Sequence, residues 1–314
     1  MKEEAIRVKF SIVNGIRVVE VPAKDFRVVM FDGRKKAMGP NRCNAGFFGN
    51  YKEEGELFTL PAGHVVCDYE ATSKWVRHYC EQRGTFKGGR LHYTAPLNGS
   101  PLSTLIVRSG IANILEVNAA PSVCGYAISG VPVLRIGKTV RYEGARAQGW
   151  DGSSMRATMH IFAGVKSSNA DTVYILGMKT TTGNLLSSGE AARKCKALGL
   201  RDVIKLDGGG SYYLNAGGNI QATAENRRVC TILDFGPLEG NPYAAPTRTL
   251  YPGSSDTTGV CWLQYELTER GYRCELDGSF GSVTTKQLKA YQAANGLEPD
   301  GICGPATRAS LLKK

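Results

Sequence analysis

The sequence predicts a larger α+β domain, with a mixed β-sheet and flanking helices, followed by a small all-α domain of three helices. Three observations support this prediction. Short β-branched runs alternate with glycine turns in the first part, a stretch with three prolines follows at Asn241–Ser255, and a turn–helix motif is then repeated. The length of 314 residues also suits about two domains, at roughly 100–200 residues each.

Strands and one helix are predicted before the proline-rich stretch. The strands are Ser103–Arg108, Val131–Ile136, Thr158–Phe162, Asp171–Leu176, Asp202–Leu206 and Val229–Phe235. The helix spans Gly189–Leu198, where Ser187 and Glu190 have capping-box spacing and Gly199 follows the end. A mixed sheet with few helices is expected, in an α+β or α/β arrangement.

The stretch Asn241–Ser255 is interpreted as a linker, and an internal repeat follows it. Asp277–Thr284 (DGSFGSVT) returns 23 residues later as Asp300–Thr307 (DGICGPAT), and each copy is a glycine turn that enters a helix. A third helix precedes both copies, because its apolar residues are spaced i, i+3, i+7 and a glycine closes the run. Three short helices are therefore expected.

The composition excludes several classes of protein. No run of 18 or more apolar residues occurs, so no transmembrane helix is predicted. The start, Met1–Glu4, lacks the apolar segment of a secretory signal, so we expect either release by another route or a leader that was removed. C-x-x-C is absent and the four histidines are scattered, which gives a zinc site no support. No cofactor is predicted.

The net charge of +11 lies in the first part of the chain. Residues 256–314 hold seven basic and seven acidic residues, whereas residues 1–255 hold 32 and 21. Such an excess suits nucleic acid, a phosphate-bearing glycan or an anionic cell wall, or it serves solubility alone. Nucleic acid is the least favoured of these partners, because Lys and Arg form no run of five and no aromatic-interleaved segment occurs.

The tail resembles the peptidoglycan-binding type 1 domain over residues 258–312, through CWLQYELTERGY, LDGSFGSVTTKQLKAYQAANGL and PDGICGPATRASLL. The resemblance implies a non-catalytic module that holds an enzyme on bacterial cell wall. The alternative is that these residues only build the three-helix fold. Cys261, Cys274 and Cys303 either include a disulfide that staples the small bundle or remain free thiols.

Two motifs in the first part are candidates for chemistry. In Asn44–Asn50 (NAGFFGN), the glycines permit a tight loop that the phenylalanines can anchor, which would leave Asn44 pointing into a cleft. In Val203–Ser211 (VIKLDGGGS), a buried strand ends in Asp207 before three glycines and a hydroxyl. The alternatives are an ordinary turn for the first motif and, for the second, an aspartate that caps its own loop.

The ordered set of motifs resembles the phosphodiester glycosidase family, whose best-known activity removes N-acetylglucosamine from a phosphodiester-linked mannose. The matching elements are NAGFFGN, LFTLPAGHVVCD, the arginine in MRATMHIFAG, SSGEAARKCKALGL, IKLDGGGSYYL and ENRRVCTILDF. The resemblance implies a catalytic domain at 1–240, a linker at 241–256 and a peptidoglycan-binding domain at 257–314. It implies a site made of Asn44, Gly46, Arg156, Glu190, Asp207, Gly208, Gly209, Ser211 and Arg228.

Glycosyl cleavage usually needs two carboxyl groups. On the resemblance, Asp207 would be the nucleophile or base and Glu190 the acid, with a capping role as the alternative for Glu190. Arg156 and Arg228 would stabilise a phosphate or another anion, or else form structural ion pairs. Asn44 would hydrogen-bond a sugar hydroxyl or the acetamido group.

Several nearby side chains have a packing role as their alternative. Trp150, Tyr212 and Tyr213 could stack on sugar faces, but the core is the commoner place for such residues. His160 is expected to be a satisfied core histidine. A calcium ion held by oxygens around the glycine turn stays open, although no D-x-D-x-D-G loop occurs.

The sequence therefore predicts a hydrolase that is targeted to the bacterial cell wall and cleaves a glycosidic or sugar-1-phosphodiester bond in wall glycan. A wall-binding module without a leader is similar to phage lysins. The expected partner is peptidoglycan or a wall polysaccharide, with no nucleic acid and no membrane. The alternatives are a non-catalytic wall carbohydrate-binding protein on a degenerate enzyme fold and, last, a nucleic-acid-binding protein.

Overall fold

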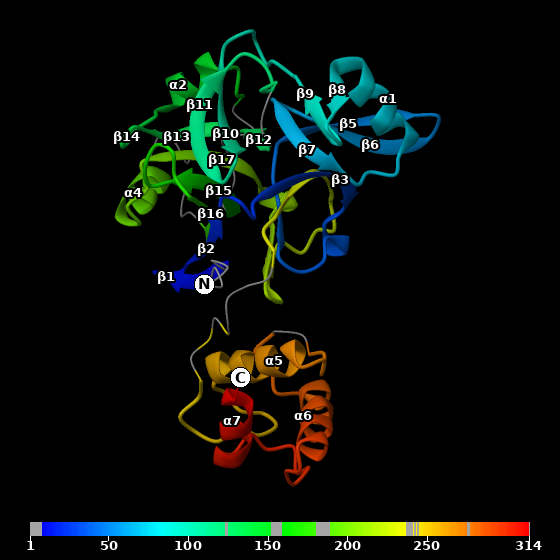
Figure 1. Cartoon of the computed structure of the whole chain (residues 1–314), viewed down its shortest axis with the longest axis vertical. Coiled ribbons are helices and arrows are strands. Elements are labelled where there is room, and N and C mark those ends of the chain that lie inside the picture. The colour runs from blue at the N-terminus through cyan, green and yellow to red at the C-terminus, as the bar shows by residue number, and fades with distance from the viewer. Residues whose placement is uncertain are drawn as a thin grey trace. The chain divides into compact units, whose positions relative to one another are not determined.

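The computed structural model describes residues 8–122, 125–151, 159–179, 189–236, 241, 243, 245–274 and 277–313. The chain divides into two compact units. Unit 1 comprises Met1–Asn215 and Gln221–Pro237, and unit 2 comprises Ala216–Ile220 and Leu238–Lys314. Strands dominate the first and helices the second (Figure 1), so the fold is an α+β domain with a small helical domain, as predicted.

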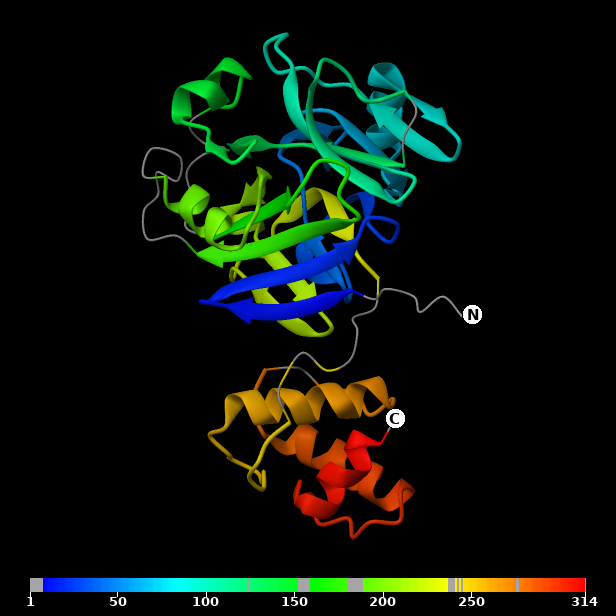
Figure 2. The same ribbon diagram turned by 60° about the vertical axis from the view of Figure 1, so that its left-hand side comes forward.

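The first sheet has the described strand order β1-β2-β16-β15-β17-β13-β14. Its strands are β1 (Lys9–Val13), β2 (Ile16–Pro22), β13 (Val131–Arg135), β14 (Lys138–Thr139), β15 (Met159–Val165), β16 (Thr172–Lys179) and β17 (Asp202–Gly208). Figure 2 shows the blue N-terminal strands alongside the green strands of this sheet, and these pairings are antiparallel. Helices α2 (Tyr142–Ala147) and α4 (Glu190–Ala197) share an apolar core with the sheet.

The second sheet has the described order β11-β10-β12-β7-β3-β20-β4-β18-β19, with β8 and β9 joined to β7. Its strands are β3 (Arg27–Arg34), β4 (Arg42–Asn44), β7 (Val65–Tyr69), β8 (Gly84–Lys87), β9 (Arg90–Tyr93), β10 (Leu102–Arg108), β11 (Ile111–Val117), β12 (Tyr126–Ser129), β18 (Tyr213–Ala216), β19 (Asn219–Ala222) and β20 (Arg228–Asp234). Strands β3 and β7 pair in parallel, whereas β20 is antiparallel to both β3 and β4.

Smaller elements complete unit 1. Strands β5 (Phe48–Glu53) and β6 (Glu56–Pro61) form a separate hairpin. Helix α1 (Lys74–Arg83) begins after Ser73, whose hydroxyl accepts hydrogen bonds from two backbone N–H groups of the first turn. Two 3₁₀ turns, η1 (Lys35–Ala37) and η2 (Gly209–Ser211), lie beside the candidate site.

The elements predicted from sequence in the first part are confirmed. The six strands correspond to β10, β13, β15, β16, β17 and β20, and the helix corresponds to α4. The start of α4 differs from the prediction, because Gly189 is its N-cap with φ of 63° and makes no side-chain cap. Ser187, the expected capping residue, lies outside the described residues.

The helices of unit 2 also agree with the prediction. They are α5 (Thr257–Glu269), α6 (Ser282–Ala294) and α7 (Pro305–Leu312). Their core includes Leu263, Leu288 and Leu311, each at most 1% exposed. None of the helices in the described part of the chain is long and apolar enough to cross a membrane.

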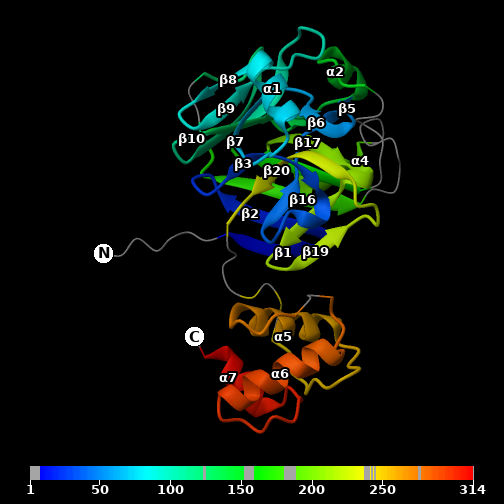
Figure 3. The ribbon, with the colours of Figure 1, turned by 90° about the vertical axis from the view of Figure 1, so that its right-hand side faces the viewer.

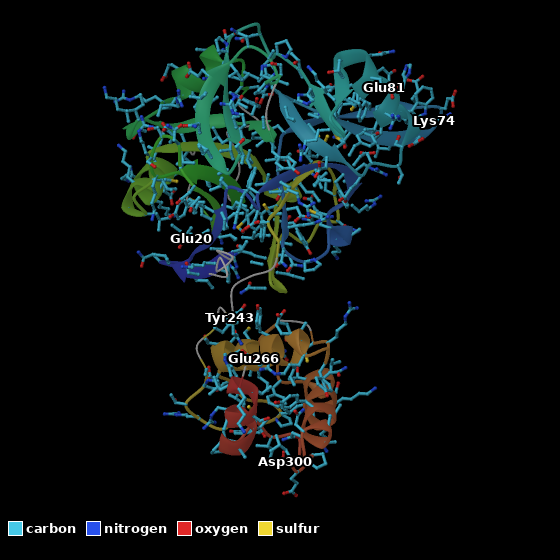
Figure 4. The ribbon with its side chains drawn as sticks, in the orientation of Figure 1. Glu20, Lys74, Glu81, Tyr243, Glu266 and Asp300 are labelled. Atoms are coloured by element: carbon cyan, nitrogen blue, oxygen red, sulfur yellow. The ribbon has the colours of Figure 1, made fainter. Side chains whose placement is uncertain are left out.

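A buried glutamine closes each copy of the repeated turn. Gln264 Nε2 donates to Asp277 Oδ1 at 2.8 Å, to the carbonyl oxygen of Ser279 at 3.0 Å and to Thr284 Oγ1 at 3.1 Å, while its Oε1 accepts from Gly278 N at 3.0 Å. The second copy repeats these contacts with Gln292, Asp300 (Figure 4), Ile302, Thr307 and Gly301 at 2.8–3.2 Å. The repeated Asp, Gly and Thr therefore have a structural role within each turn.

Part of the stretch interpreted as a linker is integrated into unit 2. Leu250 is 1% exposed, and it exchanges two backbone hydrogen bonds with Cys303, at 3.2 and 2.8 Å. Asn241 Nδ2 donates to the carbonyl oxygen of Trp262 at 2.9 Å. The thiols of Cys274 and Cys303 are free, so neither forms the disulfide that was one of the sequence-based alternatives.

Candidate active site

Asp207 lies at the end of β17, where a β-bulge interrupts the pairing with β15. His160 pairs with Gly208, whereas Phe162 pairs with Lys205, so β17 has two residues opposite one residue of β15. Such a bulge leaves backbone groups of the extra residue outside the regular hydrogen bonds between the strands, and it changes the direction of a side chain. Gly208 is required for this close pairing, because a Cβ there would lie 2.3 Å from a carbonyl oxygen of β15.

The backbone of Asp207 joins the end of β17 to the NAGFF loop. Its N–H donates to the carbonyl oxygen of Ala45 at 2.7 Å, and its carbonyl oxygen accepts from Asn44 Nδ2 at 2.9 Å. Asn44 Oδ1 accepts from the N–H of Tyr213 at 2.8 Å. The structure thus brings the two predicted motifs together across more than 160 residues of sequence.

The expectation that Asn44 points into a cleft is wrong. Its side chain is buried, with 1% of the residue exposed, and both ends of its amide are engaged by the backbone. Gly46, the other predicted residue of this loop, donates its N–H to Thr231 Oγ1 of β20 at 2.9 Å. The loop is therefore fixed from two sides, and Asn44 positions Asp207.

The glycine turn after Asp207 is held by a lysine that the sequence analysis missed. Gly209 has φ of 56°, and the turn forms η2. The fully buried Lys35 donates from Nζ to the carbonyl oxygens of Gly210 at 2.8 Å and Tyr212 at 3.2 Å, and to Thr223 Oγ1 at 2.6 Å. Burial lowers the pKa of this ammonium, and hydrogen bonds to these three acceptors and to the carbonyl oxygen of Thr223 at 3.0 Å compensate its lost hydration.

Asp207 is half-buried at the end of β17. One oxygen, Oδ1, accepts from the N–H of Gly208 at 2.8 Å, and no described residue donates to Oδ2. Burial raises the pKa of Asp207 above its usual value, and this effect outweighs Lys205, the Ser211 hydroxyl, the Gly208 N–H and Arg227, which all lower it. A carboxyl so placed can hold or release a proton nearer neutral pH than an ordinary aspartate.

Ser211 Oγ is a second polar group beside Asp207. The residue is 1% exposed, and its hydroxyl influences the pKa of Asp207. Even so, the oxygen meets no described atom in hydrogen-bond geometry. Buried hydroxyls usually have a partner, so this one is a candidate to bind a ligand or water.

The other predicted charged residues have structural partners or lie outside the described residues. Glu190 forms an ion pair with Lys194 at 2.7 Å, one turn along α4. Arg228 pairs with the buried Asp32 at 3.1 Å, which is the structural alternative considered for it. Arg156 lies outside the described residues.

The aromatic residues considered for sugar stacking pack in the interior. Trp150, Tyr212 and Tyr213 are each at most 4% exposed. His160 is buried and its ring lies 5.7 Å from that of Phe162, as expected for a core histidine. In the described part of the chain, no group of three or more His, Cys, Asp or Glu side chains could hold a metal ion.

Two further cations at the site escaped the sequence analysis. Lys205 is 1% exposed, its Nζ lies 4.5 Å from the centre of the Phe47 ring, and burial lowers its pKa to about 8. Arg227 contributes to the potential at Asp207, and it pairs with Glu225 at 3.0 Å. A lysine inside an otherwise apolar strand, VIKLD, was the available signal for Lys205.

Comparison with known proteins identifies the class of the second unit. Residues 256–311 match the family model described as "Putative peptidoglycan binding domain". The chain therefore carries a peptidoglycan-binding domain, which supports a cell-wall-associated function.

A curated relative and two solved structures show more limited similarity. The N-acetylmuramoyl-L-alanine amidase CwlM of Mycobacterium tuberculosis is 41% identical over 80 residues, which are 24% of this chain and 19% of that protein. The chain thus spans about a fifth of that relative's length.

The catalytic domain of zebrafish N-acetylglucosamine-1-phosphodiester alpha-N-acetylglucosaminidase has a TM-score of 0.44 at 15% identity, covering 73% of this chain and 81% of its own. A hypothetical protein from Synechocystis has a TM-score of 0.37 at 12% identity, covering 72% and 61%. Similarity at this level establishes neither the fold nor the activity of unit 1.

Proposed function

We propose that the chain is a glycan hydrolase that is held on the bacterial cell wall by its peptidoglycan-binding domain. In this proposal, residues 1–240 cleave a glycosidic or sugar-1-phosphodiester bond in wall glycan. Residues 241–256 connect them to the wall-binding residues 257–314. The proposal places the catalytic chemistry at Asp207.

The observation that carries the proposal is the placement of Asp207. A bulge turns the residue out of β17, and hydrogen bonds from Asn44 and to Ala45 fix its backbone. Its carboxyl keeps one oxygen without a described donor, and burial raises its pKa. A rigidly held carboxyl of raised pKa suits proton transfer at a sugar, and in its ionised form it could also attack the sugar carbon.

In the proposed reaction, Asp207 acts as nucleophile or base, and Glu190 supplies the proton to the leaving oxygen. With a phosphate leaving group, less proton help is needed, and a cation near the carboxyl would stabilise the developing charge. Arg227 is better placed for that role than Arg228, because Arg227 already acts on Asp207 while Arg228 is paired with Asp32. The hydroxyl of Ser211 would bind the substrate.

Unit 2 has a candidate surface for binding the cell wall. A recess of about 570 Å³ lies between Pro252 and the start of α6, with Phe280 in its lining and Lys286 and Lys289 at its edge. Apolar surface beside two cations suits a glycan or peptide that bears carboxylates.

The test is digestion of purified bacterial wall by the wild type, by Asp207→Asn and by the exposed control Asp25→Asn, with mass analysis of the products. We expect new reducing ends or sugar-phosphate products from the wild type and the control. Asp207→Asn should release at least about a hundredfold less while still binding the wall. Wall binding without any product from the wild type would support the binding-protein alternative. Release of stem peptides without new sugar ends would indicate amide cleavage, and either result would contradict the proposal.

A further inference from the structure

A pocket of unit 1 is lined by basic and hydroxyl side chains that the proposed reaction does not use. It has a volume of about 400 Å³ and lies where the end of α1, the hairpin β8–β9 and residues 120–122 meet. We call it the basic pocket, and its polar lining residues include Arg83, Thr85, Lys87, His92, Thr94 and Ser122. Figures 1 and 3 show α1, β8 and β9 well away from α4, within unit 1.

The register of the hairpin explains why these side chains gather on one face. Thr85 pairs with His92, and successive residues of a strand point to opposite faces, so Lys87 lies on the same face as Thr85. Phe86 and Leu91 are cross-strand partners on the other face, where Leu91 is fully buried. The hairpin therefore has an apolar face, on which Leu91 is buried and Phe86 is 36% exposed, and a polar, basic face toward the pocket.

His92 is held in one orientation toward the pocket. Its Nδ1 lies 2.9 Å from the carbonyl oxygen of Pro121, and because a carbonyl oxygen only accepts, Nδ1 carries a hydrogen. Thr94 Oγ1 accepts from the N–H of Ala120 at 3.1 Å, which fixes the segment above the hairpin.

The charge of the basic pocket is not neutralised by its own lining. Among the described residues that line it, none is Asp or Glu. The nearest acidic residue along α1, Glu81, is labelled in Figure 4 and pairs with Arg77 at 2.9 Å. Arg83 and Lys87 are both exposed, and although Arg83 Nη1 donates to Tyr93 Oη at 3.5 Å, its other N–H groups can reach a ligand from solvent.

We propose that the basic pocket binds phosphate groups of an anionic cell-wall polymer. The lining brings Arg83, Lys87 and hydroxyl side chains together from the helix end, the hairpin and residues 120–122, and Arg and Lys are both common ligands of phosphate. No Phe, Tyr or Trp is among the described lining residues, so the pocket lacks the stacking surface that single-stranded nucleic acid uses. The basic pocket accounts for part of the excess positive charge of residues 1–255. Phosphate binding there does not depend on hydrolysis at Asp207.

Calorimetric titration of the full-length protein with a soluble poly(glycerol phosphate) oligomer tests this proposal. The test variant carries Arg83→Gln and Lys87→Gln, and the control carries Arg108→Gln and Lys138→Gln, two exposed cations outside the pocket with the same change in net charge. We expect the pocket variant to bind about tenfold more weakly than the wild type, and the control to bind within about twofold.

Lys87→Glu alone provides a second variant at an exposed position, and it should weaken binding by at least as much. A carboxylate polymer of similar charge density should bind the wild type more weakly than the phosphate polymer. If the pocket variant and the control variant lost the same amount of binding affinity, net charge alone would attract the polymer. That result would overturn the proposal of a binding site in the basic pocket. Equal affinity for the carboxylate polymer would overturn the assignment to phosphate. Neither readout involves hydrolysis, so failure here is distinguishable from failure of the proposed activity.

Discussion

Replacing Gln264 with leucine tests whether the repeated turn of unit 2 is held together by its glutamine. Leucine has a similar size and can fill the same buried position, but it removes all four hydrogen bonds of the side chain. The N–H of Gly278 and the carbonyl oxygen of Ser279 then lose this partner inside a partly buried turn. At about 1–3 kcal/mol for each such group, reduced for partial exposure, we expect a loss of roughly 3 kcal/mol.

A loss of this size corresponds to about a hundredfold increase in the opening of the turn, at 1.4 kcal/mol for each factor of ten. Hydrogen exchange followed by mass spectrometry on the full-length protein reports this opening for peptides of α5 and α6. Gln287→Leu on α6 is the matched control, since Gln287 is half-buried and makes no hydrogen bond with the described residues. We expect less than about threefold faster exchange there. If Gln264→Leu exchanged no faster than Gln287→Leu, the structural explanation of the repeated motif would be refuted.

Three further predictions concern unit 1. Burial lowers the pKa of Lys205 from its usual 10.5 to about 8. Between these two pH values the folded protein has released the Lys205 proton, whereas the unfolded chain still holds it. The free energy of unfolding therefore rises with pH in this window. In urea unfolding, we expect Lys205→Met to be more stable than the wild type below pH 8, by up to about 3 kcal/mol. This difference in stability should shrink as the pH approaches 10.5. A difference that stays constant with pH would contradict the prediction. Arg227→Gln should slow wall hydrolysis about two- to fivefold and move its pH optimum upward, because it removes a positive charge that lowers the pKa of Asp207. Arg228→Gln should mainly lower the melting temperature, because it leaves the buried carboxylate of Asp32 without its ion-pair partner. The reverse pattern would assign the site to Arg228. Gly208→Ala should destabilise unit 1 by about 3 kcal/mol in thermal unfolding, because its Cβ would collide with the facing strand, while Gly304→Ala, with open space around it, should change little.

The features that sequence could predict are local ones. The strand of Val203–Leu206 is visible as a β-branched run, and the glycines after Asp207 mark where it ends. The helices of unit 2 follow from apolar spacing and from turn residues such as Gly278 and Pro305. Each of these inferences depends on residues that lie within a few positions of one another.

The features that sequence could not predict depend on partners far along the chain. The role of Asn44 was misjudged because its amide binds the backbone of Asp207 and Tyr213, and no local pattern reveals such partners. Arg227 and Arg228 are adjacent, yet Arg227, just before β20, acts on Asp207, whereas Arg228, the first residue of β20, pairs with Asp32. Their roles could be separated only after the fold was known.

The position of β20 has a consequence for synthesis of the protein on the ribosome. This strand comes last among those of unit 1, yet it lies between β3 and β4, and its Thr231 anchors the NAGFF loop. A nascent chain that ends before this strand lacks the centre of the second sheet. It also lacks Thr231, whose hydroxyl holds the NAGFF loop against which Asp207 is hydrogen-bonded. The hydrogen-bonded surroundings of Asp207 are therefore complete only when translation of unit 1 is complete. Two fragments divided between Asn44 and Asp207 would each be inert, and their reassociation could be followed by complementation.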